Sequence, residues 1–407
     1  MTWEPFVYTN PNKKEPEPES EPAASAGDPR DLRWSWVEID KRAIDHNVRQ
    51  FKQLVGPRVR VLAVVKADGY GHGAVECARL ALTAGASWLA VATAYEGIEL
   101  RDAGITDPIL ILSEPPISAI PSVLDHNLIP ALYTVDFALQ LGEQAARRGI
   151  VADYHLAINT GMNRIGVWHK DVAEFLRTIS FHAGIKLQGT FTHFATADEP
   201  DELSFRLQLR RFNEALSLIR LAGEDPGIVH CANSAAAMRY PEAHFDMIRL
   251  GICMYGLAPS PYLRGKMDLR PAMSVHARIT AVNDVPMGEG VSYGLHYQSP
   301  GGVKICTIPI GYADGLSRQL SGHMKVIYNC EAYQQVGNIC MDQCMFEVDS
   351  RATRSGAPVE PEVGDEVIVI GSQGDFSARL DDMADAMGTI NYELACRFGM
   401  RMLRVYV

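Results

Sequence analysis

The sequence predicts an α/β fold in which an N-terminal (β/α)8 TIM barrel is followed by a mostly β C-terminal domain. Short apolar runs with β-branched residues alternate with helical stretches from about residue 36 to about residue 257. Eight such units in about 220 residues match the size of a (β/α)8 barrel. After about residue 265 the periodicity changes to two, which indicates strands with one buried face.

Residues 1–33 differ from the rest and are expected to form a disordered tail. The stretch NKKEPEPESEPAASAGDP is rich in Pro, Glu and Ser and has almost no large apolar side chain, so burial cannot offset the entropy lost on ordering. It has no apolar segment of the kind found in a secretory signal. The barrel is then expected over 34–265 and the β-rich domain over 266–407.

The eight barrel strands are expected at short apolar runs, as strands buried on both faces require. These runs lie at residues 61–66, 88–92, 109–112, 128–132, 153–158, 185–192, 228–231 and 247–252. Helical periodicity fills the gaps. Apolar side chains from Phe205 to Ile219 recur at steps of four and three, which predicts one buried face of a helix that begins near Pro200.

In the second domain, apolar and polar residues alternate from Met273 to Thr280, which predicts a half-buried strand. Further strands are expected near 302–308, 324–328, 340–348 and 366–370, with one late helix near 377–387.

Composition excludes several classes of protein. A net charge of −11 argues against a nucleic-acid surface, which needs clustered Lys and Arg. No run approaches the roughly 18 apolar residues of a membrane span. Eight cysteines are scattered without zinc-site spacing, so we expect reduced thiols in a cytoplasmic protein and no metal site.

The stretch AVVKADGYGHG places Lys66 at the end of the first barrel strand. A lysine there can simply mark where a strand meets water. Its glycines match neither the P-loop nor the dinucleotide-binding motif. However, barrel enzymes place reacting groups at the carboxyl ends of their strands. A lysine that is fixed and partly desolvated there can act as a neutral amine and form a Schiff base with an aldehyde cofactor.

Later strand ends supply side chains that suit such a cofactor. In HCANSAAAM, Asn233 and Ser234 follow strand seven and either cap a helix or bind a phosphate, and Gly251 after strand eight permits close backbone approach. His193 is either a satisfied core histidine or stacks on the cofactor ring. Arg249 either forms a structural salt bridge or pairs with a pyridine nitrogen. With the lysine, these residues suggest pyridoxal phosphate.

From about residue 34 to 407 the chain closely resembles the alanine racemases, which are fold-type III pyridoxal-phosphate enzymes. The motifs AVVKADGYGHG, TGMNRIG, THFATADE, HCANSAAAM, IRLGICMYGLAP, VSYG, IGYADG and GNICMDQ occur in the family's order. The resemblance implies interconversion of L-alanine and D-alanine with pyridoxal 5′-phosphate, which would supply D-alanine for peptidoglycan synthesis.

The resemblance also implies a role for each matching residue. Lys66 carries the cofactor, and Tyr293 of VSYG is the opposing catalytic tyrosine. The implied cofactor contacts are Tyr70, Ser234, Gly251, Ile252 and Tyr392 at the phosphate, His193 at the ring and Arg249 at the ring nitrogen. Asn233, at the end of strand seven, is a further candidate for cofactor binding. The implied substrate contacts are Arg164 and the backbone of Met341, with Tyr312 at the entrance.

Racemisation needs one base on each face of a planar carbanion. Lys66 would serve the D face and Tyr293 the L face. Tyrosine is a poor base, so the Arg249–His193 pair is expected to be the cationic neighbour that stabilises its phenolate. In this family the tyrosine comes from the partner's β domain, so the resemblance implies a homodimer with shared active sites.

One departure from the family concerns the substrate arginine. Many relatives read K-x-D-T-G-M, with the lysine carried as a carbamate that holds this arginine, whereas this chain has Ala157 and Asn159. A bound chloride could fill that space and restore the charge. Asn338 stands where relatives commonly have Arg.

Serine and broad-specificity racemases also lose the lysine, so these activities stay alternatives, while Tyr392 favours alanine as the substrate. A catalytically silent pyridoxal-phosphate protein is a further alternative, but such single-barrel relatives lack the β domain.

Overall fold

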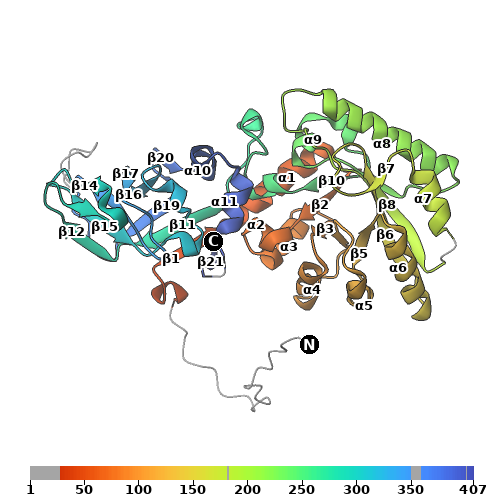
Figure 1. The fold of residues 1–407 in the computed structure, drawn as a ribbon, viewed down its shortest axis with the longest axis horizontal. Helices are drawn as coiled ribbons and strands as arrows, with labels where there is room; N and C mark the ends of the chain where they lie inside the picture. Colours follow the sequence, from red (N-terminus) through yellow and green to blue (C-terminus); the bar gives the residue numbers. More distant parts are fainter. Residues whose placement is uncertain (1–27, 181–182, 350–358, 400) are drawn as a thin grey trace, which may run out of the picture.

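The computed structural model describes residues 28–180, 183–349, 359–399 and 401–407. Figure 1 shows two lobes, a barrel surrounded by helices and a smaller lobe made mostly of strands. One buried apolar cluster extends from the barrel into the second lobe, from Val61 through Val275 to Val369. The predicted fold class is therefore confirmed.

Eight parallel strands form the nearly closed barrel in the order β10-β2-β3-β4-β5-β6-β8-β9. Their bounds are β2 Arg60–Val64, β3 Trp88–Val91, β4 Ile109–Ile111, β5 Ile129–Leu132, β6 Ala152–Asn159, β8 Ile185–Phe191, β9 Ile228–His230 and β10 Met247–Leu250. Each coincides with a predicted apolar run. The backbone amide of Arg249 in β10 donates to the Ala232 carbonyl at 2.9 Å, so this hydrogen bond links β10 to the segment after β9. A short strand, β7 Val167–Trp168, pairs with β6.

Helices pack around the outside of the barrel (Figure 1). They are α1 Lys41–Val55, α3 Ala74–Thr83, α4 Ala94–Asp102, α5 Ile120–Asp125, α6 Val135–Arg147, α7 Val172–Ile179, α8 Leu203–Leu221 and α9 Ser234–Arg239. A short turn, α2 Lys66–Tyr70, follows β2. The predicted face of α8 is buried, including Phe205, Phe212 and Ile219, which confirms the periodicity argument for this helix.

The second lobe is built on a twisted sheet in the order β12-β15-β18-β17-β16-β19-β11-β1-β21. Its strands are β1 Ser35–Ile39, β11 Met273–Arg278, β12 Ala281–Asp284, β15 Lys304–Ile308, β16 Lys325–Tyr328, β17 Glu331–Val336, β18 Cys344–Val348, β19 Glu366–Gln373, β20 Phe376–Ala378 and β21 Leu403–Tyr406. A hairpin of β13 Gly290–Val291 and β14 Tyr297–Gln298 and the helices α10 Leu380–Met387 and α11 Asn391–Arg397 complete it. The strand expected over 340–348 begins only at Cys344, because the preceding residues form a loop.

Strand β1 belongs to the second sheet although it precedes the barrel in sequence. It pairs antiparallel with β11, where Val37 lies opposite Val275, and parallel with β21, where Val37 lies opposite Arg404. The chain therefore begins its described path in the second lobe, forms the barrel and returns. This pairing brings β21 close to the barrel end of the lobe (Figure 1).

Candidate functional site

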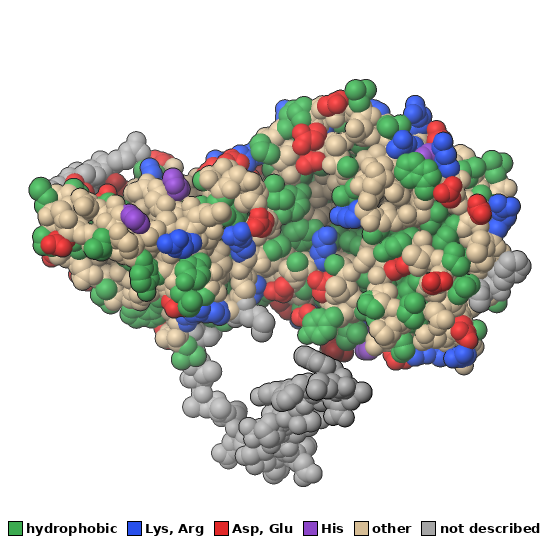
Figure 2. Space-filling view, in the orientation of Figure 1, with side chains coloured by type: hydrophobic (Ala, Val, Ile, Leu, Met, Phe, Trp, Pro, Cys, Tyr) green, Lys and Arg blue, Asp and Glu red, His purple; other side chains and the backbone are tan. Residues whose placement is uncertain are grey.

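A cavity of about 450 Å³ opens at the carboxyl ends of the barrel strands. Figure 2 shows the barrel lobe hollowed, with hydrophobic and basic side chains around the hollow. The predicted site residues that line the cavity are Lys66, Tyr70, Ala157, Asn159, Arg164, His193, Asn233, Ser234, Arg249, Gly251, Ile252 and Tyr392. They come from the ends of five strands, β2, β6, β8, β9 and β10, and from α11, so the barrel brings together residues far apart in sequence.

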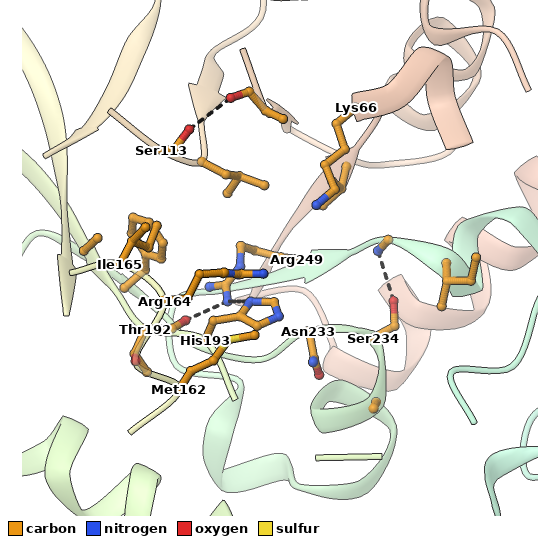
Figure 3. Close-up of a pocket in the computed structure, with 18 of the residues that line it drawn as sticks. Lys66, Ser113, Met162, Arg164, Ile165, Thr192, His193, Asn233, Ser234 and Arg249 are labelled. Atoms are coloured by element: carbon orange, nitrogen blue, oxygen red, sulfur yellow. Dashed lines mark hydrogen bonds between the residues drawn. The ribbon is translucent and has the colours of Figure 1, made fainter. Parts of the chain in front are cut away.

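Lys66 extends into this cavity from just beyond β2, opposite Arg249, Arg164 and His193 (Figure 3). Burial lowers the pKa of its ammonium group, and the positive charge of Arg164 lowers it further. Both effects favour the neutral amine, which is the nucleophilic and basic form. The environment is thus the partly desolvated one expected for a reactive lysine.

Tyr70 lies at the end of the same turn and also faces the cavity. Its ring packs against Tyr255, with ring centroids 5.0 Å apart, and lies 6.2 Å from the ring of Tyr392. Burial raises the pKa of the Tyr70 phenol, so its hydroxyl keeps its proton and can donate a hydrogen bond.

Ser234 and Gly251 meet at the side of the cavity nearest α9. The Gly251 amide donates to the Ser234 hydroxyl oxygen at 3.0 Å, shown as a dashed line in Figure 3. The helix cap is Asn233, whose side-chain oxygen accepts from the Ala236 amide at 2.9 Å. Ser234 is therefore not the cap, and its hydroxyl proton is available to a ligand in the cavity.

Arg249 is a buried cation at the base of the cavity. Its guanidinium donates to the carbonyls of Thr192 (2.7 Å), His230 (3.0 Å) and Cys231 (3.1 Å). Within the described residues no carboxylate pairs with it, so the salt-bridge alternative is not observed. Burial lowers the pKa of Arg249 to about 10, and the group stays charged at neutral pH.

His193 accepts a hydrogen bond from Arg249 at its Nδ1, over 3.1 Å. Burial, followed by the charge of Arg249, holds the pKa of His193 well below its usual value, so the imidazole is neutral. The sequence-based expectation of a cationic Arg249–His193 pair is corrected in this respect, because two adjacent positive charges would repel each other in a poorly solvated site. The positive charge lies on the arginine alone.

The segment after β6 holds Ala157, Asn159 and Arg164. Ala157 is buried in a small cluster with Ala131 and Phe191. The Asn159 side-chain oxygen accepts from the Gly161 and Asn163 amides at 3.0 and 3.1 Å and so orders the loop. Arg164 is exposed in the single chain and has no hydrogen bond or ion pair with the described residues. Its guanidinium is free to bind an anion.

Tyr293, Tyr312 and Met341 do not line the cavity. They lie in the second lobe with 73%, 43% and 52% of their surface exposed. The loop around Met341 contacts both tyrosines. The side-chain amide of Asn338 donates to the Tyr293 carbonyl at 2.6 Å, and the backbone amide of Tyr312 donates to the Cys340 carbonyl at 3.0 Å. Tyr293 lies in the turn between β13 and β14, and Figure 1 places β14 at the end of the lobe away from the barrel. One chain alone does not bring these residues to its own cavity.

Two buried histidines near the site were not predicted from the sequence. The Arg249 guanidinium donates to Nδ1 of His230 at 3.0 Å, and Nε2 of His230 lies 2.8 Å from Nδ1 of His155. Both histidines are fully buried on barrel strands. The available signal was a histidine within each of two apolar strand runs, because a buried imidazole needs a polar partner.

Comparison with known proteins identifies the family. Residues 39–259 match the alanine racemase N-terminal domain, and residues 272–406 match the alanine racemase C-terminal domain. The chain belongs to the alanine racemase family. The resemblance that the sequence motifs indicated is confirmed.

Individual alanine racemases align over nearly the whole chain. That of Desulfovibrio desulfuricans is 43% identical over 372 residues, which cover 91% of this chain and 98% of the relative. That of Synechocystis is 41% identical over 92% of this chain and 99% of the relative. The crystal structure of alanine racemase from Bacillus anthracis with bound L-Ala-P has a TM-score of 0.86 at 37% identity, covering 92% of this chain and 95% of the other.

Two further observations apply to the described part of this alanine racemase family member. No helix there is both long and apolar enough to cross a membrane. No group of three or more His, Cys, Asp or Glu side chains there is arranged to hold a metal ion. The side chains gathered in the cavity are instead an amine, hydroxyls, an imidazole and guanidinium groups.

Proposed function

We propose that the protein interconverts L-alanine and D-alanine with pyridoxal 5′-phosphate bound in the barrel cavity. The observation that carries this proposal is the amine of Lys66, with its lowered pKa, in one cavity with the buried cation of Arg249 and the hydroxyls of Tyr70 and Ser234, in a chain of this family. When bound, pyridoxal phosphate supplies an aldehyde that condenses with amines and a ring that delocalises the charge left at the α-carbon.

The residues at one side of the cavity suit the phosphate group. Tyr70 and Ser234 offer hydroxyl donors, and Gly251 and Ile252 offer backbone at the same place. A Cβ built on Gly251 would lie 3.0 Å from the Tyr70 hydroxyl, so any larger residue would fill the space proposed for the phosphate. Asn233 and Tyr392 border the same region.

The residues at the base of the cavity suit the ring. Arg249 holds its proton permanently near neutral pH and would donate to the ring nitrogen without protonating it. That arrangement weakens the ring as an electron sink and suits a simple proton transfer. Neutral His193, fixed by its bond from Arg249, would pack against the ring.

Lys66 and Tyr293 would act as the two bases on opposite faces of the substrate. The neutral amine of Lys66 would take or return the α-proton on one face. Tyr293 would be supplied by a second copy of the chain, and the charge of Arg249 would stabilise its phenolate. In support, Tyr293, Tyr312 and Met341 are exposed in the single chain and do not line its cavity. The proposed assembly is a homodimer with two shared sites.

The proposed substrate contacts are Arg164 for the carboxylate, with the backbone of Met341 and the entrance residue Tyr312 from the partner. An anion such as chloride near Ala157 and Asn159 would supply the charge that a carbamylated lysine provides in many relatives. Arg164 has no carboxylate partner among the described residues, which favours such an anion. Serine and broader specificity remain the alternatives, because they too accompany the loss of that lysine.

Mixing two inactive variants tests the shared site. Lys66→Ala and Tyr293→Phe each remove one base, and in a mixed dimer one of the two sites is intact. Random mixing should restore about a quarter of wild-type racemase activity, as expected for a two-fold dimer with sites built from both chains. Absence of restored activity after subunit exchange would contradict the shared site.

Two direct measurements test the cofactor and the substrate. Borohydride reduction followed by peptide mapping should find the cofactor on Lys66, and attachment to another lysine would exclude the assignment. Initial rates with a panel of L-amino acids should be highest for alanine. A higher kcat/KM for serine would move the protein to the alternative specificity.

A further inference from the structure

The turn that carries Lys66 has an unusual backbone. Ala67, Asp68, Gly69 and Tyr70 all have left-handed dihedrals, with φ of 52°, 52°, 60° and 53°. Only glycine adopts this region without a steric penalty, and the other three residues have side chains. Such a conformation persists only when surrounding contacts hold it in place.

This turn sets the positions of two groups that face the cavity. Lys66 and Tyr70 stand at its two ends, and both line the cavity. A change in the left-handed backbone between them would therefore alter the distance and direction between the amine and the phenol. Whatever holds the turn also aims these two side chains.

Part of the support comes from the barrel. The Glu96 carboxylate accepts from the Ala67 amide at 2.7 Å, and the Asp68 carboxylate accepts from the Ala74 amide at 2.9 Å. Glu96 is fixed in turn, since its second oxygen accepts from the Ala92 and Thr93 amides at 2.7 and 3.0 Å.

The rest of the support comes from strand β21 of the second lobe. Arg404 forms an ion pair with Asp68 at 3.0 Å and donates through Nε to the Gly71 carbonyl at 3.0 Å. It also donates to the Phe398 carbonyl at 2.9 Å, and its side chain is 15% exposed. The Tyr406 hydroxyl donates to the His72 carbonyl at 3.1 Å. One guanidinium thus links the turn to the strand that pairs with β1.

We propose that Arg404 is a positioning residue, which holds the left-handed turn and thereby aims Lys66 and Tyr70 into the cavity. The effect on the turn stands independently of the proposed function, whereas the consequence for cofactor binding rests on it. Arginine is suited to this task because its planar fork reaches three oxygens at once: the Asp68 carboxylate, the Gly71 carbonyl and the Phe398 carbonyl. A lysine has one point of charge and would satisfy only part of this set.

Arg404→Met and Arg264→Met provide a matched comparison. Arg264 also joins the two lobes, through ion pairs with Asp381 (3.1 Å) and Asp385 (2.7 Å), but its bonds do not involve the turn. Loss of either arginine removes a cation that links the lobes. Only loss of Arg404 removes bonds to the turn.

Hydrogen exchange of the purified holoenzyme measures the turn directly. The amides of Gly69, Gly71 and Gly73 donate to carbonyls within the segment from Val65 to Gly73 at 2.8 to 3.0 Å, so their protection reports on its conformation. We expect at least tenfold faster exchange in this segment for Arg404→Met, with wild-type exchange there for Arg264→Met. The dissociation constant of pyridoxal phosphate should rise at least tenfold for Arg404→Met only. Arg404→Lys should lie between wild type and Arg404→Met in both readouts.

Two outcomes would overturn the proposal. One is wild-type exchange and wild-type cofactor affinity in Arg404→Met. The other is equally faster exchange in the two methionine variants, which would show that packing of the lobes matters rather than this contact.

If Arg404→Met does not fold, Asp68→Asn serves instead, since it removes the ion pair while its amide oxygen can still accept from Ala74. Asp68→Asn should accelerate exchange in the same segment, and unchanged exchange would equally refute the idea. If Arg404→Met loosens the turn but the wild-type protein proves to lack racemase activity, this inference stands and the proposed function is rejected.

Discussion

Gly71 occupies a position where any side chain would meet backbone from another lobe. It has φ of 81°, and a Cβ built there would lie 2.1 Å from the Ala395 carbonyl oxygen of α11. Gly388 has a similar left-handed backbone, with φ of 66°, but a Cβ there meets nothing within 4 Å. Comparing Gly71→Ala with Gly388→Ala therefore separates backbone strain from the clash.

The expected magnitudes follow from these two terms. Gly388→Ala should cost about 1–2 kcal/mol, the penalty for an L-residue in the left-handed region. Gly71→Ala should add an overpacking cost of about 1–3 kcal/mol, because the contact is more than ~1 Å shorter than an optimal one and backbone cannot rotate away. The total for Gly71→Ala is about 2–5 kcal/mol. Since α11 also carries Tyr392, its displacement should weaken cofactor binding.

Thermal unfolding and cofactor titration test this expectation. Gly71→Ala should lower Tm clearly more than Gly388→Ala, at about 2–4 °C for each kcal/mol in a domain of ~200 residues. The dissociation constant of pyridoxal phosphate should rise for Gly71→Ala and stay at the wild-type value for Gly388→Ala. Equal shifts in Tm together with unchanged cofactor affinity would refute the argument that Gly71 is required by close packing on α11.

Three further predictions concern the site. Tyr293→Phe should retain pyridoxal phosphate while racemisation falls by at least ~10²-fold, and a near-wild-type rate would reject the two-base scheme. Racemase activity should rise from a chloride-free baseline as chloride is added, and a high-resolution structure should show an anion near Ala157 and Arg164. Activity that does not change with halide, together with only apolar packing at this place, would mean that other groups hold Arg164. Burial lowers the pKa of Lys66, so between that pKa and the ordinary lysine value the unfolded chain binds more protons, and the stability of cofactor-free protein should rise with pH. This rise should be smaller in Lys66→Met, and identical pH profiles of the free energy of unfolding would contradict it.

The barrel and most of its cavity could be predicted because their signals are local or follow from topology. A short apolar run is sufficient to locate a strand such as β3, and parallel strands in a barrel bring their carboxyl ends to one mouth. Lys66, Ser234 and Arg249 could therefore be grouped in one cavity although they lie far apart in sequence. Their convergence in one cavity is what the structure shows.

Other features could not be predicted because they depend on distant partners. The run SWVEI does not indicate which sheet it will join, and the partners of β1 lie beyond the whole barrel in sequence. Ala67 and Tyr70 carry no signal for left-handed backbone, which Gly69 and, more weakly, Asp68 would suggest. The neutral state of His193 depends on burial beside Arg249, which residue types do not reveal. Arg404 contacts Asp68 only after the two lobes pack together.

The position of β1 between β11 and β21 has a consequence for folding. On the ribosome β1 emerges well before the barrel and long before either of its two partners. Its Trp36, Val37 and Ile39 side chains are fully buried in the final structure, but they lack their partner strands while the barrel forms. An unpaired strand exposes backbone N–H and C=O groups that can pair with a strand of another chain. Removing β21 would turn β1 into a permanent edge strand, so aggregation of nascent chains is expected in addition to the loss of the contacts that Arg404 and Tyr406 make with the turn after β2.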